Sequence, residues 1–232
     1  MAFVKEGFRK VCFRIAKLTV SKLFLVVLTA GLSFSIAGPA AGVEDEQDYW
    51  EKAPKVWQEM QELRRIEVSA QTKGDRTFSK GAGFVKAKVP SVWAFATHPE
   101  KIRKSSRFLK EFIWDPATGD VEMQIELLYV SHRLKGKAHK LPDAENPRIQ
   151  FKVLEGSLVP FEGELEIRSA LAHAKRKNTL PFPKEMTLVR ISGVSSEGRS
   201  LSWPMRVALE AVLQRTAGAL RAAVEAEENK QR

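Results

Sequence analysis

Apolar and polar residues alternate strictly in two stretches of the chain, residues 121–127 and residues 161–167. In both stretches an apolar residue or glycine stands at every odd position, and Glu or Gln stands at every even one. A period of two is that of a β-strand with one face buried and the other in water. We therefore expect both stretches to be strands of an antiparallel sheet that is covered on one side only.

Shorter apolar runs predict the rest of this sheet. Val85, Ala87 and Val89 alternate with two lysines, which indicates a first strand, and Gly81 and Gly83 suggest a bulge near its start. Turn residues at 116–120 separate two of the later strands. The later strands are expected at residues 108–114, 121–130, 149–154, 158–167 and 186–193.

Three other regions have helical spacing. Residues 47–64 place Trp50 and Trp57 among polar residues and predict an amphipathic lead-in helix. Pro90 opens a short helical segment, and a second one follows and runs through Lys104. A long helix is expected from the N-cap Ser202 through residue 228, with a slim middle at residues 217–219. Its apolar stripe is Leu209, Leu213, Thr216, Leu220 and Val224.

The first 43 residues have the composition of an export signal. Six basic residues between positions 5 and 22 precede the uncharged run Leu23–Val43. Without an Arg-Arg pair ahead of that run, a Sec-type route is favoured. Cleavage is favoured, with small residues at Ala37, Ala40 and Gly42 as plausible points, but about 20 apolar residues suffice to cross a bilayer, so an uncleaved anchor remains open. In either case we expect the domain in the periplasm or on the outer side of the inner membrane.

This leader divides the chain into three parts. We expect a signal peptide or membrane anchor at residues 1–43, an amphipathic lead-in helix within residues 44–70, and one compact domain at residues 71–232. About 190 residues after the leader suit one α+β domain with extensions better than two domains.

The net charge of +10 is shared between the leader and the rest of the chain. The leader carries half of it, and the remaining +5 suits an anionic membrane surface or solubility better than DNA. Basic runs at residues 101–107, 133–140 and 175–177 are expected in solvated loops, where they could also meet anionic lipid headgroups. We expect no nucleic-acid partner and a monomeric protein.

The sequence carries no recognisable catalytic or metal-binding pattern. Cys12 is the only cysteine and precedes the uncharged run, so it fits neither a lipoprotein site nor a disulfide. His98, His132, His139 and His173 form no i, i+4 pair. No nucleophile elbow, phosphate-binding loop or dinucleotide glycine motif is present. We therefore expect no catalytic residue, no metal and no cofactor.

Residues 89–100, V-P-S-V-W-A-F-A-T-H-P-E, resemble the first-helix motif V-W-x-x-hydrophobic-x-D-P-E of the START-like (SRPBCC) superfamily, with His98 where Asp is commoner. This superfamily includes polyketide cyclases, coenzyme Q-binding proteins and lipid-transfer domains. Residues 155–165 are similar to its paired hairpin, and the final helix follows Leu201-Ser202-Trp203-Pro204. The likeness covers residues 75 to 228.

The resemblance implies an α+β helix-grip fold. In this fold a curved antiparallel sheet wraps around a long C-terminal helix, and two short helices follow the first strand. A deep apolar pocket then lies between the sheet and the last helix, lined by aromatic and branched side chains. The residues expected to line it are Trp93, Phe112, Trp114, Met123, Ile125, Tyr129, Phe151, Phe161, Leu209 and Leu213.

Three functions follow from this expectation. The favoured one is an exported, non-enzymatic carrier or binding domain for a lipid, a quinone or a polyketide-like molecule. The second is a cyclase or dehydratase-type enzyme, which predicts a polar pair inside the pocket. The third is an envelope protein-interaction module with a filled core, in which an exposed Trp50 or Trp57 makes the contact.

Overall fold

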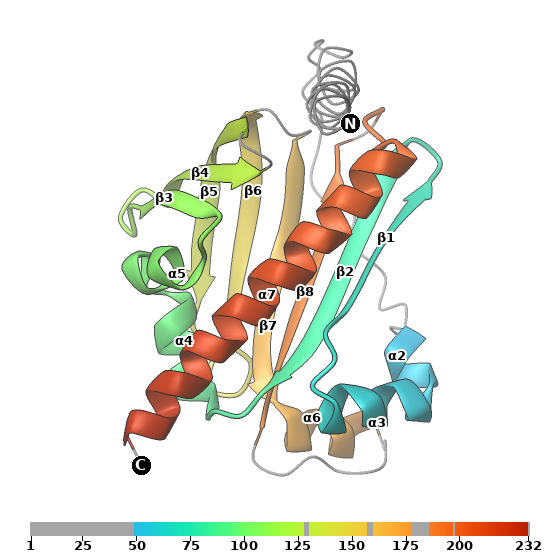
Figure 1. Ribbon diagram of the computed structural model, residues 1–232, viewed down its shortest axis with the longest axis vertical. Helices are drawn as coiled ribbons and strands as arrows, with labels where there is room; N and C mark the ends of the chain where they lie inside the picture. Colours follow the sequence, from blue (N-terminus) through green and yellow to red (C-terminus); the bar gives the residue numbers. More distant parts are fainter. Residues whose placement is uncertain (1–48, 128–129, 157–159, 178–185, 197, 232) are drawn as a thin grey trace, which may run out of the picture. The chain divides into compact units, whose positions relative to one another are not determined.

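The computed structural model describes residues 49–127, 130–156, 160–177, 186–196 and 198–231 (Figure 1). The predicted leader lies outside these residues, so its cleavage or anchoring stays a prediction. Among the described residues, no helix is long and apolar enough to cross a membrane.

The described strands form one antiparallel sheet in the order β1-β2-β8-β7-β6-β5-β4-β3 (Figure 1). Every pair of neighbours is antiparallel, as the alternating sequence pattern predicted. The strands are β1 (Glu67–Lys73), β2 (Arg76–Val85), β3 (Leu109–Trp114), β4 (Asp120–Leu127), β5 (Val130–Leu141), β6 (Arg148–Gly156), β7 (Phe161–Ser169) and β8 (Thr187–Ser195).

Helix α7 (Trp203–Gln231) runs diagonally across one face of this sheet, and α4 (Val89–Ala96) and α5 (Pro99–Ser105) lie beside its C-terminal half (Figure 1). The main core on this face joins α4, α7, β2 and β7 through Val85, Ala87, Val92, Phe95, Ile167 and Val224. The two short helices and the long one thus stand where the sequence predicted them.

A second core lies on the other side of β2 and β8. It involves α2 (Tyr49–Lys52), α3 (Pro54–Glu62) and α6 (Ala170–Lys177), and it comprises Trp50, Trp57, Met60, Ala82, Phe84, Ala170, Ala174 and Leu188. Successive residues of a strand point to opposite faces of the sheet. Phe84 and Leu188 therefore pack in this second core, whereas Val85 and Val189 pack in the main core beneath α7. The lead-in region is therefore an integral part of the fold.

The structure corrects the expected lead-in helix. Helix α3 ends at Glu62, and residues 67–73 form the edge strand β1 rather than a continuation of the helix. The prediction of an exposed Trp50 or Trp57 is wrong, because both side chains are 1% exposed. Trp57 packs edge-on against Phe84, with ring centroids 5.0 Å apart.

The first predicted strand is also displaced. The strand is β2 at 76–85, and α4 begins at Val89 because Pro90 stands in its first turn, where a missing N–H is tolerated. No bulge occurs at Gly81 or Gly83, since the register of β2 with both neighbours is continuous there. The basic run 133–140 lies in strand β5 and not in a loop.

Side chains of α7 bond backbone groups of residues 64–70, which lead from the end of α3 into β1. The backbone N–H of Ala70 donates to Glu210 Oε1 at 2.6 Å, Gln214 donates to the carbonyl of Ile66, and Arg221 donates to the carbonyl of Arg64. Arg64 has a φ of 59° in the position after the α3 C-cap that usually holds glycine. Its guanidinium forms an ion pair with Glu225.

Candidate ligand pocket

A cavity of about 210 Å³ lies between the sheet and α7. Strands β1, β2, β7 and β8 form its floor, α7 covers it, and α4 and α5 close one end. Nearly all of its lining is apolar. The lining residues are Ile66, Val68, Gly81, Ala82, Gly83, Phe84, Val85, Val92, Phe95, Ala96, Ile102, Leu165, Ile167, Val189, Ile191, Leu213, Thr216, Ala217, Leu220, Arg221 and Val224.

Glycines on β2 leave much of this space open. A Cβ on Gly81 would come within 3.1 Å of the Ile191 side chain, and a Cβ on Gly83 within 3.3 Å of Ile66. On α7, the lining positions 213, 216, 217, 220, 221 and 224 recur every three or four residues and so face the sheet together. The small Ala217 in this row keeps the helix from filling the space beneath it.

Two of the lining residues are polar, Thr216 and Arg221. The Arg221 guanidinium donates through Nη1 to the carbonyl of Arg64. Burial lowers the pKa of Arg221, and the positive charge of Arg64 lowers it further, while Glu225 acts against both. The guanidinium is therefore only partly compensated by its surroundings.

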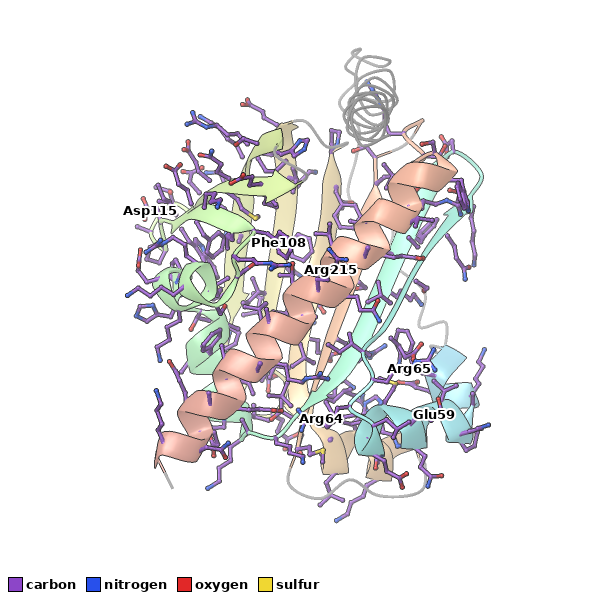
Figure 2. All side chains as sticks on the ribbon, viewed as in Figure 1. Glu59, Arg64, Arg65, Phe108, Asp115 and Arg215 are labelled. Atoms are coloured by element: carbon purple, nitrogen blue, oxygen red, sulfur yellow. The ribbon has the colours of Figure 1, made fainter. Side chains whose placement is uncertain are left out.

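Glu225 is shared between several groups at this point. It pairs with the Arg64 guanidinium and also accepts the backbone N–H of Lys86 at 2.8 Å. The Glu225 carboxylate therefore interacts with the guanidinium groups of Arg64 and Arg221 and with the backbone N–H of Lys86. Figure 2 shows Arg64 just beyond the end of α3.

Leu213 is the residue from the predicted lining that contributes to this cavity. Four others lie in the neighbouring cluster around Ala138 and Ile149, further along the same face of the sheet. These four are Trp93, Phe112, Trp114 and Phe151. The Trp114 ring is tied to the sheet, since Nε1 donates to Ala138 O at 3.2 Å and Lys140 Nζ lies 4.7 Å from the ring centroid.

Phe161 stacks against Phe151, with ring centroids 6.2 Å apart. A Cβ on Gly163 would lie 2.7 Å from the Phe151 ring, and one on Gly193 would lie 2.2 Å from the Phe161 ring. Gly163 and Gly193 are partners across β7 and β8, so each ring lies over a glycine where no larger residue fits.

The remaining predicted residues lie apart from the cavity lining or outside the description. Met123 and Ile125 are half-buried on β4, and Leu209 is half-buried on α7. Tyr129 lies outside the described residues. The ten-residue lining therefore stays a prediction as a whole. Arg221 was not predicted, although its spacing of eight residues from Leu213 placed a cation on the apolar face of the helix.

A chain of buried polar groups crosses the second core. His173 Nε2 lies 2.8 Å from Glu51 Oε1, and His173 Nδ1 lies 2.9 Å from Arg168 Nη1. Glu166 forms ion pairs with both Arg168 and Arg190. This row of polar side chains joins α2, α6, β7 and β8 on the face of the sheet opposite to the cavity. It therefore has a structural role in the fold and does not line the cavity.

The basic runs of the sequence are distributed over α5, β5 and α6. On β5, Lys135 pairs with Glu122 and Lys137 pairs with Asp120, both on the neighbouring strand β4. On α5, Lys101 pairs with Glu227 of α7. Contact of these runs with a membrane surface stays a prediction.

Comparison with known proteins gives likenesses among solved structures. No protein-family model matches the sequence, and no curated protein matches it. A START superfamily protein from Mycobacterium smegmatis is 12% identical, with 67% of this chain and 99% of that chain covered and a TM-score of 0.45.

Two further structures are similar to the same degree. A STAR-related lipid transfer protein from Xanthomonas axonopodis is 13% identical, with 68% of this chain and 93% of that chain covered and a TM-score of 0.48. An aromatase/cyclase from Streptomyces sp. R1128 is 18% identical, with 67% and 95% covered and a TM-score of 0.49.

The fold follows from the topology itself. Two short helices succeed β2, six further strands continue the antiparallel sheet from β3 at its far edge back to β8 beside β2, and one long helix lies across one face. This is the arrangement that the motif at residues 89–100 implied, preceded here by the edge strand β1. The chain has the START-like helix-grip fold.

Proposed function

We propose that this protein is an exported cell-envelope binding or carrier protein that holds a hydrophobic small molecule in the cavity beneath α7. One observation carries the proposal. A cavity of about 210 Å³ with a nearly continuous apolar lining lies beside the packed core clusters of the domain. Transfer of a ligand's apolar surface into such a space is favourable by about 25 cal/mol per Å².

The cavity favours binding over the alternatives considered. A cyclase or dehydratase needs a group that can accept or donate a proton near neutral pH. The polar lining residues are Thr216 and Arg221, and an arginine stays protonated in proteins. The interaction-module alternative required a filled core and an exposed Trp50 or Trp57, and both tryptophans are buried.

Export is part of the proposal and rests on the leader sequence alone. The basic segment and the uncharged run Leu23–Val43 support it. Cell fractionation followed by N-terminal sequencing of the recovered protein would test it. A new N-terminus near residue 43 in the periplasm means cleavage, an intact N-terminus in the membrane means an anchor, and intact protein in the cytoplasm contradicts export.

Ligand binding is tested by solvent extraction of the protein purified from cells expressing the full chain, with mass spectrometry of the extract. A stoichiometric hydrophobic compound is the expected result. The variant Ala217→Phe, which places a ring in the cavity, serves as the matched control and should lose that compound. An equal yield of the compound from both proteins would place it outside this cavity.

A further inference from the structure

We propose that the cavity takes a compact apolar molecule carrying one carboxylate, with the carboxylate bound by Arg221. This inference rests on the proposed function, because it assigns the chemical class of the ligand to the same cavity. Three properties of the site support it: the size of the cavity, the position of its single cationic side chain, and the charges around that side chain.

Size restricts the ligand to a small molecule. An apolar cavity of about 150 Å³ accommodates benzene, and pockets for drug-sized ligands span about 300–1,000 Å³. At about 210 Å³ the space beneath α7 falls between these values. It suits one ring with a short substituent, or a branched chain of similar volume.

The position of Arg221 gives the site its polarity. It lies on α7 one turn after Ala217 and one turn before Glu225, and it lines the cavity together with Leu220 and Val224. A guanidinium offers five N–H donors in a planar fork that matches a carboxylate. Among the described residues, its hydrogen bond is the one from Nη1 to the carbonyl of Arg64. The remaining donors can serve a ligand.

The neighbouring charges favour an anion over a neutral group. Burial and the adjacent Arg64 both disfavour the charged form of Arg221 and lower its pKa, and the opposing Glu225 is shared with Arg64 and the Lys86 N–H. A carboxylate entering the cavity would supply the missing negative charge. Hydrogen bonds between charged partners are about twice as strong as neutral ones.

The test compares two probes with one carbon skeleton, 3-phenylpropanoate and propylbenzene, by calorimetric and NMR titration at pH 7. For Arg221→Met, which keeps an unbranched apolar stem and removes the guanidinium, we expect about a 10-fold loss of affinity for the acid. The affinity for propylbenzene should stay within about 2-fold. The matched control is Arg215→Met, an exposed arginine on the same helix, which should change neither affinity (Figure 2).

Two further variants keep the test decisive if Arg221→Met is unstable. Arg221→Lys retains the charge and should retain most of the affinity for the acid. Glu225→Gln removes the competing carboxylate and should bind the acid more tightly than the wild type does.

The outcomes separate the two proposals. If propylbenzene binds and the acid does not, the assignment to Arg221 is wrong and the apolar site stands. The same conclusion follows if Arg221→Met and Arg215→Met have equal affinity for the acid. If neither probe binds the wild-type protein, or if Ala217→Phe leaves both affinities unchanged, this cavity is not the ligand site.

Discussion

Arg168 donates a hydrogen bond from Nη1 to Nδ1 of His173 across 2.9 Å, with both side chains buried. Because a guanidinium has no acceptor, Nδ1 must be the accepting nitrogen of the ring. Nε2 then carries the proton and donates to Glu51 Oε1 at 2.8 Å. The imidazole is therefore neutral in the fold, in agreement with burial lowering the pKa of His173 against the opposing effect of Glu51.

This arrangement predicts that mild acid destabilises the domain. A histidine in the unfolded chain titrates near pH 6.5, whereas folded His173 stays neutral to a lower pH. Below about pH 6.5 the unfolded chain takes up a proton that the folded chain does not, so the free energy of unfolding falls by at most about 1.4 kcal/mol per pH unit. The effect fades above pH 6.5 and is nearly absent by about pH 7.5. His132, whose pKa is also lowered by burial, acts in the same direction.

Urea unfolding at pH 7.5, 6.5 and 5.5 measures this dependence. The variant His173→Gln cannot titrate and should lose part of the slope between pH 6.5 and 5.5, besides being less stable at pH 7.5. The exposed His139 provides the control, and His139→Gln should keep the wild-type slope. An undiminished slope in His173→Gln would show that this residue does not carry the effect.

Trp57 is predicted to stabilise the fold and not to contact a partner. Its ring stacks on His173 at 5.7 Å and packs edge-on against Phe84, with 1% of the residue exposed. Trp57→Ala should lower the free energy of unfolding by about 3–5 kcal/mol. The adjacent exposed residue gives the control, and Gln58→Ala should cost less than about 0.5 kcal/mol. A loss below 1 kcal/mol for Trp57→Ala would contradict the buried position.

Ala217 is predicted to be a position where a larger side chain replaces the ligand. Ala217→Phe directs a ring into the cavity, whereas Ala222→Phe adds the same ring on the exposed side of α7. We expect the first variant to lose uptake of propylbenzene by at least about 10-fold and the second to keep it, as one ring occupies most of a space slightly larger than benzene needs. Equal uptake by the two variants would rule out binding beneath the helix.

The backbone of Arg64 provides a further test. With a φ of 59° it stands in the left-handed region that glycine adopts without cost, so a side chain there must be compensated by its contacts. Arg64→Ala removes the ion pair with Glu225 and keeps the strain, whereas Arg64→Gly removes both. We expect the glycine variant to be more stable than the alanine variant by about 1 kcal/mol in chemical denaturation. The reverse order would mean that the backbone at this residue is relaxed.

Strands with large apolar residues on one face could be predicted from the sequence, and strands without them could not. The alternation of apolar and polar residues at 121–127 and 161–167 predicted strands β4 and β7. Strand β5 alternates as well, but its inward positions include Gly136 and Ala138, and its outward positions are basic, so it resembled a solvated loop. Strand β1 was missed because its sequence E-V-S-A-Q-T-K has a single large apolar residue.

The candidate site was predictable in location and not in detail. The period of α7 placed Leu213, Thr216, Leu220 and Val224 on one face, and all four line the cavity. Which part of the sheet faces open space depends on residues that lack side-chain volume, such as Gly81 and Gly83 on β2. Absence of volume has no periodic signature, and several of the aromatic residues expected to line the pocket lie together in a neighbouring cluster.

The outer edge of β1 is a row of backbone groups that a free edge strand would offer to another chain. One of these groups, the N–H of Ala70, is taken by Glu210 of α7, while Gln214 and Arg221 bond the carbonyls of Ile66 and Arg64 just ahead of the strand. The helix that covers the cavity thereby also occupies part of this edge. Loss of these side chains should make the protein prone to edge-to-edge aggregation, so solubility at high concentration depends on the docking of α7.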